Sequence, residues 1–85
     1  MTRDLAQQWA GRRGIRVNAL APGYVITEMT KDYDEQQLNK ITSRTVVGRL
    51  GQAGEIASAL VWLASDAASY VHGQTLCVDG GFTIT

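Results

Sequence analysis

The chain has 85 residues, carries no formal net charge at neutral pH and is 45% hydrophobic. A chain of this length forms one folding unit with a small core, since it buries only about 60–65% of the surface that it exposes when unfolded. Zero net charge gives no electrostatic drive toward nucleic acid or an anionic membrane, and the longest apolar run, Ala57–Ala64, is too short to span a bilayer. We therefore expect a soluble, cytoplasmic protein that binds neither nucleic acid nor membrane.

The sequence contains few side chains suited to metal binding or nucleophilic catalysis. Cys77 is the only cysteine and His72 the only histidine, which excludes an internal disulfide and supplies too few ligands for a metal site. Cys77 stands in an apolar run, Leu76–Val78, which predicts a buried and unreactive thiol. We expect no metal, and no free-standing enzyme built on a nucleophile and a base.

The first two predicted elements are a helix and a strand. Residues Met1–Ala10 are typical of the end of a helix that Gly11 and Gly14 stop, with an apolar stripe at every fourth position: Met1, Leu5 and Trp9. The alternation of apolar and other residues over Ile15–Leu20 predicts a strand.

A turn follows this strand directly. Pro22 lacks an N–H and favours an extended residue before it, while Gly23 tolerates dihedral angles that other residues avoid. In an open α/β sheet, ligands bind at the carboxyl ends of the strands. The segment Pro22–Thr27 is therefore a candidate binding loop.

Two helices and a second strand complete the predicted order. Asp34 with Gln37 resembles a capping box and predicts a helix over Glu35–Ser43. Its apolar content is thin, with Leu38 and Ile41 only, which indicates a surface helix or a mobile lid. The clearest helix spans Gln52–Ser65, with an apolar face formed by Ile56, Ala59, Leu60 and Leu63. A short strand, Gln74–Val78, then ends in the turn Asp79-Gly80-Gly81.

The order of helix end, strand, lid helices, helix and strand indicates an α/β fold. A strand, a helix and a second strand form one crossover unit, which predicts two parallel strands joined by a right-handed connection. No linker or repeat marks a second domain, so residues 1–85 are expected to be one partial domain.

Three blocks of sequence, in the same order, resemble the short-chain dehydrogenase/reductase family. The first is Asn18-Ala19-x-x-Pro22-Gly23-x-Val25-x-Thr27. The second is Gly48-Arg49-Leu50-Gly51 followed by Glu55-Ile56-Ala57 and Leu63-Ala64-Ser65-Asp66. The third is Gly73-Gln74 followed by Val78-Asp79-Gly80-Gly81. They span nearly the whole chain, yet resemble only the C-terminal third of a family member. The resemblance implies the C-terminal part of a Rossmann-like, doubly wound parallel sheet that binds NAD or NADP.

The resemblance also implies roles for the loop residues. The main chain of Val25 would bond the nicotinamide carboxamide, and the Thr27 hydroxyl would contact the carboxamide or the diphosphate. Pro22 and Gly23 would line the nicotinamide pocket. Tyr24 and Met29 flank the loop and would touch a small alcohol or ketone substrate, although packing within the lid explains them equally well.

The groups that transfer hydride in this family are missing. The family uses a tyrosine followed four residues later by a lysine, whereas Glu28, Gln37 and Gln74 follow Tyr24, Tyr33 and Tyr70 at that spacing. The glycine-rich diphosphate loop is missing too. We therefore assign no catalytic residue and expect the isolated chain to be inactive.

Two hypotheses remain open at this point. The chain is part of an NAD(P)-dependent oxidoreductase that assembles as a homo-oligomer, a dimer or tetramer. Alternatively, it is a non-catalytic interaction module or remnant that docks on a partner through the open edge of the strand Ile15–Leu20, since an uncovered edge offers N–H and C=O groups for pairing.

Overall fold

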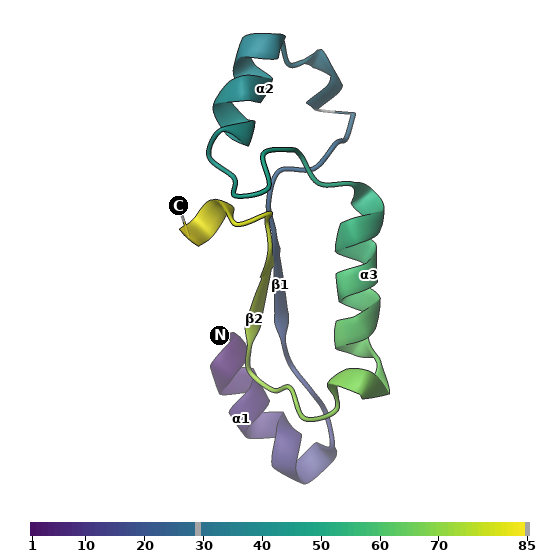
Figure 1. Ribbon diagram of the computed structural model, residues 1–85. Coiled ribbons are helices and arrows are strands. Elements are labelled where there is room, and N and C mark those ends of the chain that lie inside the picture. The colour runs from purple at the N-terminus through teal and green to yellow at the C-terminus, as the bar shows by residue number, and fades with distance from the viewer. Residues whose placement is uncertain (29, 85) are drawn as a thin grey trace.

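The computed structural model describes residues 1–28 and 30–84, except for the side chain of residue 12. Figure 1 shows an elongated molecule in which two strands run along the long axis, with one helix beside them and helices near both ends. The helices and strands, in chain order, are α1 (Thr2–Arg13), β1 (Ala19–Pro22), α2 (Glu35–Thr42), α3 (Ala53–Ala64) and β2 (Thr75–Val78). Short 3-10 turns lie at Thr30–Asp32, Asp66–Ala68 and Phe82–Ile84.

The strands β1 and β2 pair in parallel, as the crossover pattern predicted, with Ala19 opposite Thr75 and Pro22 opposite Val78. The predicted start of the first strand, Ile15, is wrong. The paired register begins at Ala19, whose N–H donates to the Gln74 carbonyl at 2.8 Å, and a single bond precedes it, from the Gly73 N–H to the Val17 carbonyl at 2.9 Å. The strand instead runs on through Pro22. Alternate residues direct their N–H groups to opposite edges, and the neighbouring Gly23 N–H donates to the Val78 carbonyl at 3.0 Å, so proline removes no bond between the two strands.

Helix α1 passes through Gly11 and ends at Gly14, whose φ of 63° provides the left-handed C-cap. The prediction that Gly11 stops the helix is therefore wrong, and the prediction that Gly14 stops it is confirmed. The predicted apolar stripe does not form the packed face. Among the described side chains of the helix, Ala6 is the buried one, because it faces Gly73 at the entry to β2.

The capping box of α2 is confirmed. The Gln37 N–H donates to Asp34 Oδ1 at 2.7 Å, and the Asp34 N–H donates to Gln37 Oε1 at 3.0 Å. Helix α2 ends one residue before the predicted end and has no buried residue. It therefore lies on the surface, as its thin apolar content predicted.

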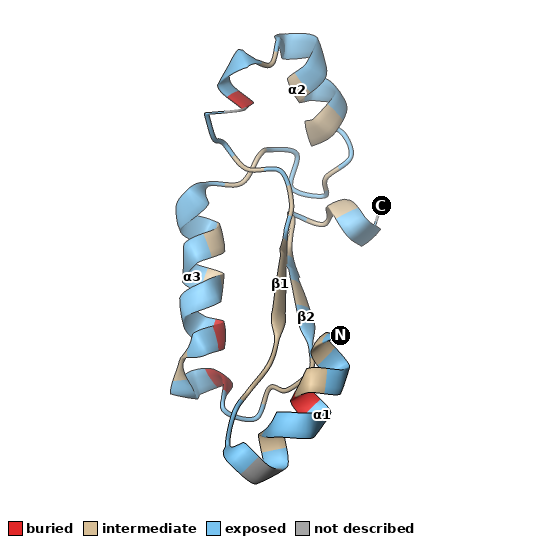
Figure 2. Cartoon of the chain, turned by 180° about the vertical axis from the view of Figure 1, so that it is seen from behind, coloured by how far each residue is buried: buried red, intermediate tan, exposed pale blue. Residues whose placement is uncertain are grey.

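Helix α3 is confirmed within one residue at each end, but its inward face is narrower than predicted. Leu63 is buried, whereas Leu60 is 54% exposed and Val61 68% exposed. Figure 2 shows the buried and half-buried positions of α3 turned toward the strands and the exposed positions turned away. Arg16, just before β1, donates from Nη1 to the Leu63 carbonyl at 2.8 Å and from Nη2 to the Ser65 carbonyl at 3.0 Å. These bonds satisfy carbonyls that a helix end leaves without partners.

The core of the described chain is thin. Its buried residues are Ala6, Thr30, Leu63 and Ala68. Cys77 is exposed, so the predicted buried thiol is wrong. Leu76 and Val78 alternate with it on β2 and are half-buried, which leaves Cys77 on the exposed side of the strand.

Candidate functional site

The loop after β1 passes close to the end of β2. A Cβ atom on Gly23 would lie 2.6 Å from the Asp79 Cβ and 2.7 Å from the Asp79 Cα, distances that real Cβ atoms do not reach. Glycine is therefore required for the close approach rather than for an unusual dihedral angle, since the Gly23 φ is not positive. This contact holds the loop against the carboxyl ends of both strands.

The backbone of Val25 is turned outward by its neighbours. The Gly51 N–H donates to the Tyr24 carbonyl at 3.0 Å, and the Ile26 N–H donates to the Gly51 carbonyl at 2.9 Å. In an extended segment, the residue between two such bonds directs its own N–H and C=O to the other side. Among residues 1–28 and 30–84, no hydrogen bond uses either backbone group of Val25.

Thr30, which the sequence analysis did not single out, fixes the end of the loop. The Thr27 N–H donates to Thr30 Oγ1 at 2.8 Å, and that hydroxyl donates to the Thr27 carbonyl at 3.0 Å. Thr30 is also buried. The signal in the sequence is the spacing of two threonines three residues apart, because short hydroxyl side chains bond to backbone groups at this distance.

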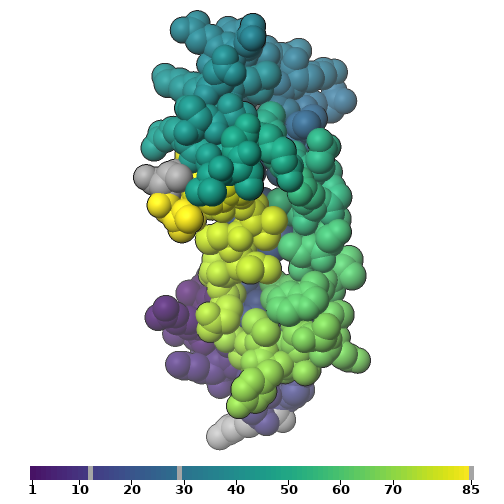
Figure 3. Space-filling view, viewed as in Figure 1, coloured from purple at the N-terminus to yellow at the C-terminus, as the bar shows by residue number. Residues whose placement is uncertain are grey.

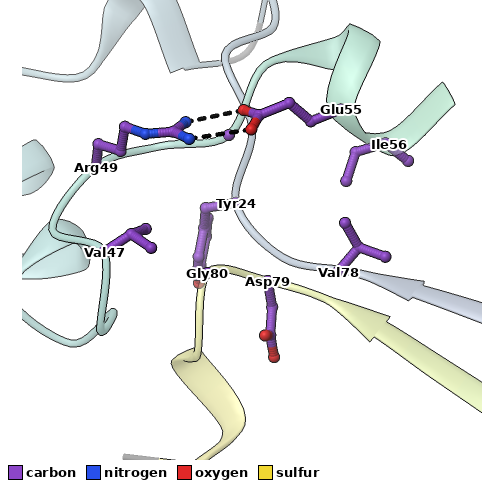
Figure 4. Close-up of a pocket in the computed structure, with 9 residues that line it drawn as sticks. Tyr24, Val47, Arg49, Glu55, Ile56, Val78, Asp79 and Gly80 are labelled. Atoms are coloured by element: carbon purple, nitrogen blue, oxygen red, sulfur yellow. Dashed lines mark hydrogen bonds and ion pairs between the residues drawn. The ribbon is translucent and has the colours of Figure 1, made fainter. Parts of the chain in front are cut away.

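The segment that pairs with Val25 is held by an ion pair. Figure 4 shows Arg49 and Glu55 joined by two bonds, Nη1 to Oε1 at 2.8 Å and Nη2 to Oε2 at 3.0 Å. Glu55 Oε1 also accepts the Gln52 N–H, which caps α3. The hydrogen bonds from Arg49 and the Gln52 backbone lower the pKa of Glu55 to about 2. Arg49 and Glu55 border a cavity of about 140 Å³ that also contacts Tyr24 and Asp79.

The segment that returns from α2 packs on the C-terminal turn. The N–H groups of Val46 and Val47 both donate to the Gly80 carbonyl, at 2.9 and 3.2 Å. Gly80 and Gly81 have φ values of 61° and 90°, and a Cβ on either would collide with a valine side chain. In Figure 3 the teal atoms of this segment lie directly against the yellow atoms of the turn.

Of the predicted site residues, Pro22 ends β1, and Gly23, Val25 and Thr27 lie on the loop that follows it. Tyr24 is 47% exposed and lines two cavities beside that loop. Met29 lies outside the described residues. Asn18 lies at the opposite end of β1, where its Nδ2 donates to the Val71 carbonyl and its Oδ1 accepts the Gln74 N–H. Asn18 therefore holds the segment that enters β2, and neither of these bonds reaches the candidate binding loop.

Residues 1–28 and 30–84 contain neither a cluster of metal-binding side chains nor a helix that could cross a membrane. No group of three or more histidine, cysteine, aspartate or glutamate side chains is placed to hold a metal ion. No helix in this part of the chain is long and apolar enough to cross a membrane.

A parallel β–α–β unit with a loop at the carboxyl end of its first strand is the repeating unit of the Rossmann class of nucleotide-binding folds. Comparison with known proteins identifies the family within that class. The family model described as Enoyl-(Acyl carrier protein) reductase matches residues 1–83. The chain belongs to this family of short-chain dehydrogenases/reductases, whose cofactor is NAD or NADP.

Three relatives illustrate the likeness. The chain is 55% identical to the galactitol 2-dehydrogenase (L-tagatose-forming) of Cereibacter sphaeroides, over 99% of this chain and 34% of that protein. It is 46% identical to the gluconate 5-dehydrogenase of Gluconobacter oxydans, over 100% of this chain and 34% of that protein. The crystal structure of a gluconate 5-dehydrogenase from Burkholderia cenocepacia with NADP and tartrate superimposes with a TM-score of 0.88 and 43% identity, covering 99% of this chain and 33% of that one. The chain thus spans about a third of the length of these relatives.

Proposed function

We propose that the chain forms one part of an NAD(P)-dependent oxidoreductase that interconverts an alcohol and a ketone. It supplies the nicotinamide loop, the substrate lid and no catalytic residue. The observation that carries the proposal is the backbone of Val25, whose N–H and C=O face away from their own sheet without a partner among the described residues. A carboxamide has one acceptor oxygen and an NH₂ donor, so it matches this pair of groups.

The remaining loop residues have complementary roles in the proposal. Thr27, held by Thr30, directs its hydroxyl toward the carboxamide or the diphosphate. Pro22 and Gly23 line the nicotinamide pocket, and Tyr24 and Met29 contact the substrate. The bound cofactor supplies the hydride chemistry, and these residues orient it.

The proton-transfer groups come from outside residues 1–85. No tyrosine in the sequence is followed four residues later by lysine, which is the pair that the family uses. The substrate class is inferred from relatives whose names describe dehydrogenases of galactitol and gluconate. A small polyol or sugar acid is the substrate that we propose.

The outward face of α3 supports assembly as a homo-oligomer. Leu60, Val61 and Trp62 are all exposed on this helix, and large exposed apolar side chains are the material of an interaction site. A dimer or tetramer that buries α3 would remove these side chains from water.

The proposal can be tested in a chimaera. This chain replaces the matching segment of the Cereibacter sphaeroides galactitol 2-dehydrogenase, so that the rest of that enzyme provides the missing two-thirds. The Thr27→Val variant removes the hydroxyl at nearly constant volume, while Thr27→Ser keeps it. We expect Thr27→Val to weaken NAD(P)H binding about 10-fold, the value of one hydrogen bond, and Thr27→Ser to retain it.

Fluorescence titration of NAD(P)H measures both outcomes. A folded chimaera that does not bind NAD(P)H would overturn the proposed function. Equal affinities of the valine and serine variants for NAD(P)H would show that the Thr27 hydroxyl does not bind the cofactor, while the other parts of the proposal would be unaffected.

A docking module is the second candidate, and the unpaired edge of β1 favours it. Among the described residues, β1 pairs only with β2. The N–H and C=O groups of Leu20 lie on its other edge, where no described strand pairs with them. A purified chain that stays a folded monomer at millimolar concentration would contradict docking between copies of this chain.

A further inference from the structure

A second cavity, of about 310 Å³, adjoins the proposed nicotinamide loop. One wall is formed by Pro22, Gly23 and Tyr24 from that loop. The lining continues with Asp79, Phe82 and Thr83 from the C-terminal turn. A group that reacts beside the nicotinamide therefore lies next to residues that are nearly sixty positions away in the chain.

The C-terminal turn is rigidly built around Asp79. Asp79 Oδ1 accepts the Gly81 N–H at 3.0 Å, and Oδ2 accepts the Thr83 N–H at 3.1 Å. The Phe82 N–H donates to the Asp79 carbonyl at 3.1 Å. These bonds fix the backbone on both sides of Phe82, so the position of its ring is set by the turn.

Phe82 connects three separate segments. Its ring lies 5.7 Å from the Tyr24 ring, centre to centre, at an interplanar angle of 60°. The Arg44 guanidinium, from the segment after α2, lies 5.3 Å from the centre of the Phe82 ring. Both distances are favourable for aromatic and cation–π interactions. The nicotinamide loop, the lid and the C-terminal turn thus meet at this side chain.

We propose that Phe82 is a specificity-determining residue that forms, with Tyr24, the apolar wall against which the carbon skeleton of the substrate packs. This inference rests on the proposed function. The carbon chain of a polyol presents C–H groups to such a wall, while its hydroxyl groups need polar partners elsewhere. The size of residue 82 then limits how large a substrate the cavity admits, and the C-terminal turn, as well as the loop after β1, sets selectivity.

Opposite changes of size at residue 82 test the proposal in the chimaera. Phe82→Ala enlarges the cavity and Phe82→Trp reduces it. The measured quantity is kcat/KM for three polyols of increasing size: erythritol, galactitol and maltitol. We expect Phe82→Ala to raise the ratio of kcat/KM for maltitol to that for erythritol about 10-fold, and Phe82→Trp to lower this ratio about 10-fold. Discrimination of this size is typical of an apolar pocket. The dissociation constant of NAD(P)H stays within about twofold in both variants, a change far below that of one hydrogen bond.

Tyr70→Ala is the matched control, since it also removes an aromatic ring but at a side chain that is 98% exposed and outside the cavity. Unchanged selectivity ratios in the two Phe82 variants, with NAD(P)H binding intact, overturn this inference alone. A change in NAD(P)H affinity without a change in the ratios also overturns it, because Phe82 then contacts the cofactor. Failure of the folded, unmodified chimaera to bind NAD(P)H overturns the proposed function and this inference together.

Discussion

Gly23 shows at the scale of one residue how the loop depends on a distant contact. Its N–H bonds to Val78, and the space where a side chain would lie is filled by Asp79. The Pro22-Gly23 pair in the sequence correctly predicted a loop at a strand end. The physical reason for the glycine lies 56 positions away and involves no local dihedral preference, so it could not be predicted from the neighbouring sequence.

Gly23→Ala is expected to destabilise the protein. The added methyl group would lie 2.6 Å from the Asp79 Cβ, so the loop or the end of β2 must move. Overpacking of this kind costs about 1–3 kcal/mol. Thermal unfolding of the chimaera measures the effect, and Gly54→Ala is the control, because a Cβ at Gly54 meets nothing within 4 Å. A Gly23→Ala variant as stable as the control would contradict the close approach.

Val25 and Thr27 illustrate which parts of the site the sequence could indicate. Their positions followed from a family resemblance in the loop. The bonds that orient them come from Gly51 and Thr30. Thr30 was detectable in principle from its spacing, whereas the pairing of Val25 with Gly51 depends on how the chain returns from α2 and has no local signal.

At the scale of elements, local capping was predictable and distant capping was not. Asp34 and Gln37 cap α2 across three residues, and the pattern is visible in the sequence. Helix α3 is capped at its C-terminal end by Arg16, 47 residues before Leu63. The start of β1 is likewise determined by a residue far away in the sequence. The strand begins at Ala19, where its backbone pairs with the segment that starts at Gln74, and not at Ile15, where the alternating pattern starts.

The ion pair of Glu55 predicts how stability depends on pH. The pKa of Glu55 falls from 4.5 to about 2 in the folded chain. A carboxylate with a depressed pKa stabilises the fold fully above the unfolded value, and this contribution is lost as the pH falls from about 4.5 to about 2. We therefore expect the difference in melting temperature between the unmodified chimaera and Glu55→Gln to be largest above pH 4.5 and to shrink below it.

Thermal melts between pH 7 and pH 3 check this expectation. Glu35→Gln is the matched control, because Glu35 also lies in the first turn of a helix but has no ion pair among the described residues. A difference for Glu55→Gln that stays constant across this range would show that the pair with Arg49 does not form in solution.

The whole molecule exposes more surface than a compact chain of its size. Its accessible surface is 6409 Å², against roughly 4,900 Å² expected for 9.2 kDa. Its radius of gyration is 15.7 Å, against about 12 Å expected for a compact domain of this length. The excess of roughly 1,500 Å² exceeds the area that one partner buries in a standard interface. A two-stranded sheet with one flanking helix has little core of its own.

We accordingly expect the isolated 85-residue chain to unfold without a cooperative transition and to bind NAD(P)H more weakly than millimolar. The unfolded state is favoured because few side chains are buried, and binding is weak because under the proposed function the chain supplies only one side of the cofactor site. Circular dichroism on heating and fluorescence titration test the two parts. A sigmoidal melt, or micromolar binding of NAD(P)H by the isolated chain, would show that the described residues suffice by themselves.

The bridge between Val25 and Gly51 has a consequence for how such a protein can diversify. The segment between Val25 and Gly51, which includes α2, leaves the sheet and returns to it. The hydrogen bonds of the bridge join its two ends. The entropy of closing a loop grows slowly with its length. Insertions or deletions around α2 therefore cost little free energy, and under the proposed function they would change the segment over the substrate without moving the cofactor loop. The architecture separates a segment whose length can vary from the loop that we propose binds the cofactor.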